Sequence, residues 1–161
     1  MSTGAWIAAA AVVVTVAVGL WRLATDGRFR VAAAPAPQEP ADAAPPAVPP
    51  GAELVASVGG ALGGRATLLQ FSSAFCAPCR ATRRVLGEVA DLVDGVTHVE
   101  VDAEQHPDAT RTFGILRTPT TVVLDPSGAE VTRAAGAPSR DQVLAAVARV
   151  GSHDADGTLN K

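Results

Sequence analysis

The feature that most constrains this chain is the segment LLQFSSAFCAPCRATRRVL, residues 68–86, which holds its only two cysteines. The run just before them, residues 66–72, is apolar and has the length of a strand. The stretch just after them, residues 78–92, repeats apolar residues at helical spacing. Cys76 and Cys79 are therefore predicted to lie where a strand leads directly into the start of a helix.

The pattern of apolar residues from position 51 onward predicts a compact α/β domain. Strands are predicted where apolar residues run continuously or alternate with polar ones, and helices where they recur at helical spacing. The predicted strands cover residues 66–72, 96–102, 120–125 and 130–136, and the predicted helices cover residues 53–62, 78–92, 106–114 and 139–150. The last two strands flank the turn PSG, which predicts a hairpin between them.

A Cys-x-x-Cys pair at the start of a helix has a specific electrostatic consequence. The first thiolate accepts hydrogen bonds from backbone N–H groups that the helix leaves unpaired, and it lies at the positive end of the helix dipole. Both effects lower the pKa of a thiol in this position. The second cysteine lies one turn further along, within reach of a mixed disulfide on the first. We therefore expect Cys76 to be the nucleophile and Cys79 the resolving thiol of a disulfide exchange.

Two other uses of the cysteine pair stay open at this point. A structural zinc site needs four ligands, whereas this chain has no second cysteine pair and its histidines stand singly. Metal binding would therefore require a dimer that pools two pairs. A purely structural disulfide between Cys76 and Cys79 would close too short a loop to stabilise the fold much. The sequence thus predicts no metal and no cofactor beyond the redox-active pair itself.

The segments FCAPCR and VEVDAEQHPDATRTFGILRTPTTVVLD, with the helix between them, resemble thioredoxins from about residue 64 to residue 150. In thioredoxins a Cys-x-Pro-Cys motif lies at this strand-to-helix junction, and a cis proline followed by threonine faces it. Thr118-Pro119-Thr120 matches that second element. The resemblance implies a thioredoxin-like fold, in which a central mixed β-sheet is flanked by helices. It also implies that Pro119 is cis and that the backbone of Thr118 pairs with an extended substrate segment.

The residues around the pair differ in part from the thioredoxin pattern. Thioredoxins usually carry a buried aspartate six residues before the first cysteine, thought to assist deprotonation of the second thiol. This chain has Gln70 there, and an amide cannot accept a proton at physiological pH. Phe75 stands in place of the usual tryptophan, while Pro78 of the motif is kept. We expect Gln70, Phe75 and Pro78 to surround the pair and to tune its reactivity.

An uncharged and almost wholly apolar run, residues 5–21, lies near the start of the chain. A helix of this length reaches roughly 26 Å, close to the ~30 Å hydrocarbon core of a bilayer. Trp6 and Trp21 stand at its ends, where indole rings favour the membrane interface. A signal peptide normally has lysine or arginine before its apolar run, but none precedes this one. Residues 1–31 are therefore predicted to be a transmembrane helix with its flank; a cleaved signal peptide and a buried core helix are the alternatives.

The rest of the chain divides by composition into three parts. Residues 32–50 are nearly all alanine and proline, which predicts an extended spacer. Residues 51–150 are predicted to form the thioredoxin-like domain. Residues 151–161 are polar and are predicted to be a disordered tail.

Three arginines bear on the orientation of the predicted anchor. Arg22, Arg28 and Arg30 follow the apolar run, and basic residues close to a span tend to stay in the cytoplasm. The catalytic domain is therefore predicted to face the cytoplasm from a single-pass position in the cell membrane. An extracytoplasmic placement is the alternative.

These features together predict a membrane-tethered thiol–disulfide oxidoreductase. Its predicted partners are protein thiols and disulfides, an unidentified electron donor, and a lipid bilayer through residues 5–21. The net charge of −3 gives no reason to expect nucleic acid as a partner. The alternatives are a non-catalytic peptide-binding module that uses the groove at Pro119 and, less favoured, a dimeric metal-binding chaperone.

Overall fold

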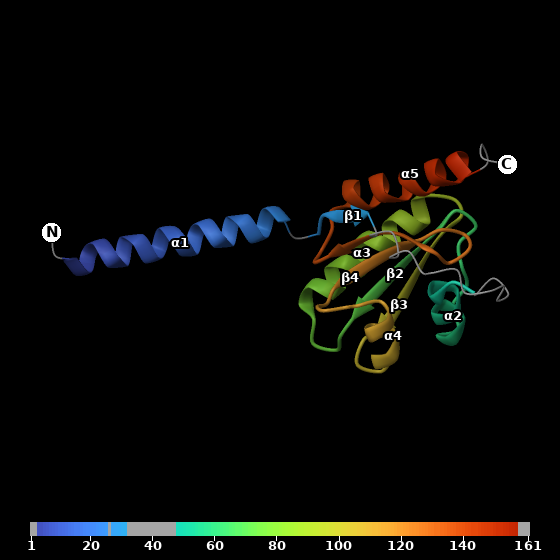
Figure 1. Cartoon of the computed structure of the whole chain (residues 1–161), viewed down its shortest axis with the longest axis horizontal. Coiled ribbons are helices and arrows are strands. Elements are labelled where there is room, and N and C mark those ends of the chain that lie inside the picture. Colours follow the sequence, from blue (N-terminus) through green and yellow to red (C-terminus); the bar gives the residue numbers. More distant parts are fainter. Residues whose placement is uncertain (1–2, 26, 32–47, 158–161) are drawn as a thin grey trace, which may run out of the picture.

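The structure is a computed structural model that describes residues 3–25, 27–31 and 48–157. One long N-terminal helix leads into an α/β domain (Figure 1). The helices are α1 (Thr3–Thr25), α2 (Pro50–Ser57), α3 (Ala77–Leu92), α4 (Pro107–Thr112) and α5 (Arg140–Gly157). The strands are β1 (Phe29–Val31), β2 (Ala66–Ser72), β3 (Val96–Asp102), β4 (Thr120–Leu124) and β5 (Glu130–Ala135).

The strands form a mixed sheet in the order β1-β5-β4-β2-β3. β2 runs parallel to β3 and antiparallel to β4, and β5 is antiparallel to both β4 and β1. The predicted strands 66–72 and 96–102 coincide with β2 and β3, and the predicted hairpin is β4–β5. The mixed α/β architecture predicted from the sequence is thus confirmed.

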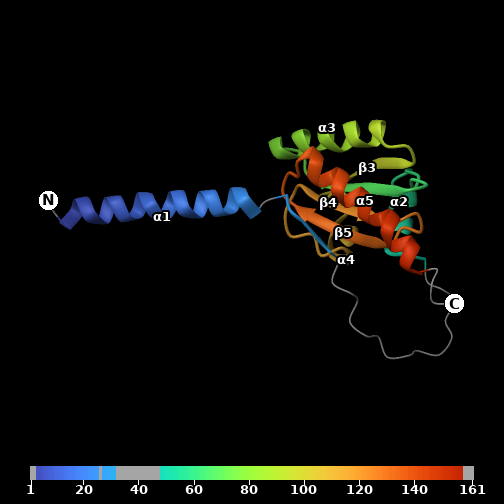
Figure 2. The ribbon, with the colours of Figure 1, turned by 90° about the horizontal axis from the view of Figure 1, so that it is seen from above.

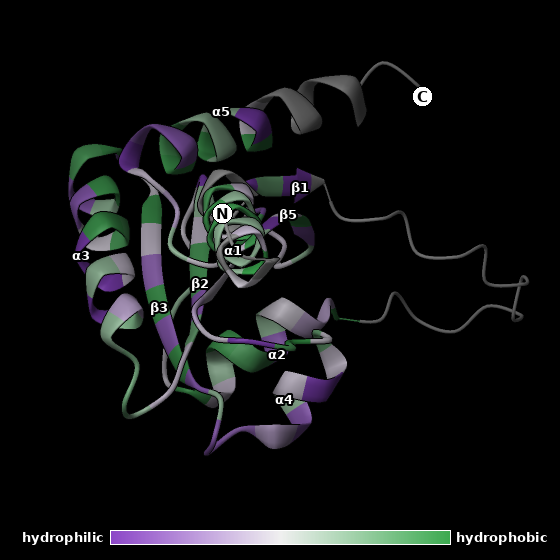
Figure 3. Ribbon diagram, turned by 90° about the vertical axis from the view of Figure 1, so that its left-hand side faces the viewer, coloured by the Kyte–Doolittle hydropathy of each residue, from purple (hydrophilic) through white to green (hydrophobic). Residues whose placement is uncertain are grey.

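Helices cover both faces of the sheet, with α3 and α5 on one face and α2 and α4 on the other (Figure 3). Every residue of β2 is buried, because alternate side chains point into two separate cores. The core under α3 and α5 includes Leu68, Leu86, Val123, Val143 and Val147. The core under α2 and α4 includes Leu54, Leu69, Phe71, Phe113 and Val122. This double burial explains why the sequence of β2 is apolar without alternation.

The edge strand β1 lies in the segment that the sequence analysis assigned to the anchor and its flank, and the sequence pattern does not predict it. Phe29 pairs with Ala134, and the Thr132 hydroxyl donates to the carbonyl of Arg30 at 2.7 Å. Gly27, just before the strand, has φ 74°, and its N–H donates to Ala135 at 3.0 Å. The sheet therefore includes residues outside the predicted domain 51–150.

Helix α1 projects away from the domain in two perpendicular views (Figures 1 and 2). Residues 5–21 are helical, and apolar side chains such as Trp6 and Trp21 are exposed along α1. In the part of the chain that the structure describes, however, no helix is both long enough and apolar enough to cross a membrane. The transmembrane helix predicted from the sequence is therefore not supported by the structure.

The C-terminal prediction needs a correction. α5 continues to Gly157, so residues 151–157 are helical where a disordered tail is predicted. Extending a helix that already packs against a sheet costs little, even where the sequence offers no further apolar face. Most of the predicted spacer, residues 32–47, and the last residues, 158–161, lie outside the described residues.

Candidate active site

The cysteine pair lies where β2 delivers the chain to the N-terminus of α3, as predicted. Cys76 is the N-cap residue of α3, and the backbone N–H of Cys79 donates to its Sγ at 3.1 Å. The two sulfurs form a disulfide, with the Cα atoms 5.2 Å apart. The Cys76 sulfur thus occupies the position in which a helix N-terminus stabilises negative charge.

The two sulfurs differ in their access to solvent. Cys76 is half-buried, whereas Cys79 is only 2% exposed. Phe75, just before the pair, is fully exposed, and Pro78 is exposed in the first turn of α3. Of the two cysteines, Cys76 is therefore the more accessible to solvent, and the exposed Phe75 precedes it in the chain.

The loop that contains Pro119 lies beside the disulfide loop. The Thr118–Pro119 peptide bond is cis, as the resemblance implies. The hydroxyls of Ser73 and Thr118 are 3.1 Å apart and form a hydrogen bond between the two loops. The carbonyl of Pro119 accepts a hydrogen bond from the Gly136 N–H at 2.8 Å. These contacts fix the proline loop next to the cysteine pair.

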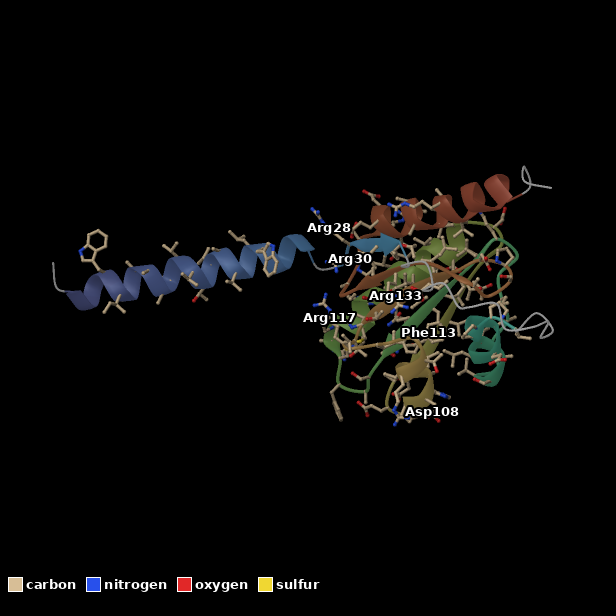
Figure 4. The ribbon with its side chains drawn as sticks, in the orientation of Figure 1. Arg28, Arg30, Asp108, Phe113, Arg117 and Arg133 are labelled. Carbon is tan, nitrogen blue, oxygen red and sulfur yellow. A yellow bond between two sulfur atoms is a disulfide. The ribbon has the colours of Figure 1, made fainter. Side chains whose placement is uncertain are left out.

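The same loop carries two exposed residues ahead of the cis bond. Leu116 is 97% exposed, and the exposed Arg117 donates to the carbonyl of Ala135 at 2.8 Å. Arg117, Arg28 and Arg30 lie on the side of the domain that faces α1 (Figure 4). The end of the domain nearest to α1 is therefore basic.

Gln70 is completely buried beneath the first turn of α3. Its Nε2 donates to the carbonyl of Cys79 at 3.0 Å, so it ties that turn to the sheet. Its Oε1 lies 3.2 Å from Nε2 of His98 on the neighbouring strand β3. Because Oε1 can only accept, this network assigns the hydrogen to Nε2 of His98. Burial, more than any other influence, lowers the pKa of His98 below its ordinary value.

A second polar group on β3 lies close to the pair, and the sequence analysis did not identify it. Glu100 Oε1 accepts hydrogen bonds from the guanidinium of Arg83 at 2.6 Å and from the hydroxyl of Ser72 at 2.5 Å, and Arg83 Nε lies 2.6 Å from Oε2 in an ion pair. Burial alone would raise the pKa of Glu100. Hydrogen bonds from Arg83 and Ser72, with the charges of Arg83 and His98, bring that pKa below its ordinary value.

These groups border a cavity of about 380 Å³ beside the disulfide. The lining residues are Ser72, Ser73, Ala74, Cys76, Cys79, Arg80, Arg83, Glu100 and Asp102. Sequence reasoning missed Glu100 because its place depends on the pairing of β2 with β3, which sets Glu100 directly opposite Gln70. No group of three His, Cys, Asp or Glu side chains within residues 3–25, 27–31 and 48–157 is placed to hold a metal ion.

The fold and the site define a protein whose chemistry resides in its own cysteine pair. A family model for thioredoxin matches residues 62–149. A thioredoxin of Alicyclobacillus acidocaldarius subsp. acidocaldarius is 34% identical over 89 residues, which are 55% of this chain and 84% of that protein. Thioredoxin H2 of Arabidopsis thaliana is 31% identical over 70 residues, 44% of this chain and 52% of that protein.

Solved structures agree with this assignment. The thioredoxin of Fasciola hepatica is 25% identical, with a TM-score of 0.50, and the match covers 60% of this chain and 88% of that one. A chloroplastic thioredoxin z has the same fold, with a TM-score of 0.52 at 22% identity, over 62% of this chain and 87% of that one. This chain belongs to the thioredoxin family. It is a thiol–disulfide oxidoreductase that acts on protein thiols and disulfides through the Cys76–Cys79 disulfide, with no external cofactor.

Proposed function

We propose that Cys76 is the attacking thiol and Cys79 the resolving thiol. The observation that carries this order is the difference in exposure: Cys76 is half-buried at the helix N-terminus, and Cys79 is 2% exposed behind it. A partner disulfide that approaches from solvent reaches Cys76, which forms the mixed disulfide. Cys79 then attacks the Cys76 sulfur and releases the partner as a thiol.

Trapping experiments on the full chain test this order. With Cys79→Ala, the mixed disulfide at Cys76 has no intramolecular thiol to resolve it, so covalent complexes with protein substrates are expected to accumulate. With Cys76→Ala, the buried Cys79 thiol should trap few or none. Equal trapping by the two variants would refute the assigned order.

We also propose how substrates dock. The exposed Phe75 and Leu116 flank the disulfide and the cis Pro119, and they offer an apolar surface to an extended segment that pairs with the backbone of Thr118. Burying an apolar side chain of this size is worth roughly 1.5–3 kcal/mol. A Phe75→Ser/Leu116→Ser double variant should therefore lose affinity for protein disulfides but react normally with a small disulfide. An equal loss toward both would argue against docking at these side chains.

The proposal extends to a lipid bilayer as a partner of α1. Residues 5–21 carry no charge, and the Trp6 and Trp21 side chains near the two ends of that run are exposed. These are the only two tryptophans of the chain, so intrinsic fluorescence reports on this helix alone. Adding phospholipid vesicles to the full chain should shift the emission to shorter wavelength and make it sensitive to quenchers in the acyl chains. Unchanged emission at saturating lipid would refute the tether.

Arg22, Arg28 and Arg30, which follow the apolar run, support a cytoplasm-facing, reducing role. In intact cells, a thiol reagent that does not cross membranes should then fail to label Cys76, and it should label Cys76 after permeabilisation. Labelling in intact cells would place the domain on the other side and reverse this part of the proposal.

A further inference from the structure

The resolving step requires a group that takes the proton of the Cys79 thiol, because only the thiolate attacks a disulfide. Gln70 stands at the sequence position of the usual aspartate, but its amide cannot accept a proton. Both ends of that amide are also in use: Nε2 donates to the carbonyl of Cys79, and Oε1 faces His98. The acceptor is therefore another side chain or the solvent.

The cavity beside the disulfide restricts the choice. In the part of its lining that the structure describes, two side chains are carboxylates, Glu100 and Asp102. Asp102 ends β3 and accepts hydrogen bonds from the N–H of Glu104 and the side chain of Gln105, at 2.9 and 3.0 Å, so it organises the following turn. Glu100 and Cys79 border the same cavity. The partners of Glu100 lie instead on β2 and α3, the two elements that adjoin the cysteine pair.

The register of the sheet explains how Glu100 reaches this place. β2 and β3 are parallel, with Gln70 directly opposite Glu100. Adjacent strands lie about 4.8 Å apart, and residues in register point to the same face of a sheet. Glu100 therefore stands one strand away from the position that Gln70 occupies, on the face covered by the first turns of α3.

We propose that Glu100 accepts the proton of Cys79 in the resolving step, through water in the cavity that both residues line, with Arg83 and Ser72 as positioning residues. This inference rests on the proposed order of the two thiols. The cavity of about 380 Å³ is large enough for several water molecules, each of which occupies about 30 Å³ in the liquid.

The hydrogen bonds around Glu100 suit this role. Arg83 holds both carboxylate oxygens, and Ser72 donates to one of them, which fixes the orientation of the group. The same contacts lower the pKa of Glu100, so the group is ionised at neutral pH and, as a weak base, keeps the proton only briefly before passing it to solvent. The other charged or titratable groups that face it are His98 on β3 and Arg80 and Asp102 in the cavity lining.

The step balances as follows. In the mixed disulfide, the proton of Cys79 passes to the Glu100 carboxylate, and the Cys79 thiolate attacks the Cys76 sulfur. The Cys76–Cys79 bond forms as the bond from Cys76 to the substrate sulfur breaks. The substrate leaves as a thiolate and takes up a proton, which Glu100 returns through solvent. Over the two exchange steps, two electrons pass from the cysteine pair to the substrate disulfide.

The test separates the two steps by reacting the reduced full chain with dithiobis(nitrobenzoate). This aromatic disulfide releases one coloured thiolate in each step. The first release reports attack by Cys76, and the second reports resolution by Cys79. In Glu100→Gln, the second phase should slow roughly tenfold to a hundredfold while the first stays within about twofold of the wild type. Glu100→Asp, which keeps the carboxylate, should have a faster second phase than Glu100→Gln. Glu88 on α3 is exposed, so Glu88→Gln is the control and should match the wild type in both phases.

The pH dependence gives a second measurement that needs no variant. Internal transfer to Glu100 predicts a wild-type second phase that changes little between about pH 5.5 and pH 7.5, whereas proton loss to solvent predicts a rise of about tenfold per pH unit. The role of Glu100 would be overturned if the rate of the wild-type second phase rose tenfold per pH unit. It would also be overturned if the second phase of Glu100→Gln were as fast as that of the wild type. A wild-type chain that releases no second thiolate would instead overturn the proposed function.

Discussion

The buried amide of Gln70 offers a direct test of how the active site is held on the sheet. Replacing it with methionine keeps a similar volume but removes both hydrogen bonds, so the Cys79 carbonyl and the His98 Nε2–H lose their partner. Each unsatisfied buried group costs about 1–3 kcal/mol. His98 is only half-buried and can turn to water, so its share should be small. The expected net loss for Gln70→Met is therefore about 1–3 kcal/mol of the free energy of unfolding.

Urea unfolding of the oxidised full chain at neutral pH measures this loss. With a slope of about 2 kcal/mol per molar urea, the midpoint should fall by roughly 0.5–1.5 M. Gln105→Met is the matched control, because Gln105 is exposed, and it should change stability by less than about 0.5 kcal/mol. If Gln70→Met is as stable as this control, the two hydrogen bonds do not anchor the first turn of α3.

Four further predictions concern the core, the backbone and pH. Leu86→Ala should cost about 2–5 kcal/mol in urea unfolding, because Leu86 on α3 is fully buried in the core. Gly87→Ala within α3 should stabilise the fold by about 0.5–1 kcal/mol, since its new methyl group meets nothing within 4 Å. Gly128→Ala should instead cost at least about 1 kcal/mol, because φ is +88° and the methyl group would lie 2.5 Å from the nitrogen of Ala52. Burial lowers the pKa of His98, so the unfolded chain takes up this proton at a higher pH than the folded chain does. As the pH falls below about 6.5, the wild type should therefore lose stability in urea unfolding, and His98→Gln should lose less. Equal pH profiles for the two proteins would contradict this.

Much of the fold follows from local sequence patterns. β2 and β3 have the predicted bounds because a continuous apolar run and an alternating one are distinct signals of strands. The predicted helix 53–62 is shorter in the structure, since α2 ends at Ser57 and Gly59 adopts φ 73°, a conformation that favours glycine. β1 has no local signal of its own: three residues become a strand only by pairing with β5, about a hundred positions later.

The candidate site also has one part that the sequence predicts and one part that it does not. Cys76, Cys79 and Pro119 could be predicted because short motifs mark them along the chain. The contacts of Gln70 with His98, and of Glu100 with Ser72, join residues 28 positions apart and arise from the parallel register of β2 and β3. A single sequence contains no signal for that register, so these partners emerge only from the folded structure.

The central claim is that Cys76 and Cys79 form a redox couple that exchanges disulfides with other proteins. The most direct measurement is the reduction of insulin by dithiothreitol in the presence of catalytic amounts of the full chain. The account predicts many turnovers per chain, a rate well above that of dithiothreitol alone, and loss of this stimulation in both Cys76→Ser and Cys79→Ser. A wild-type chain no faster than dithiothreitol alone, or a Cys76→Ser variant with full stimulation, would contradict it.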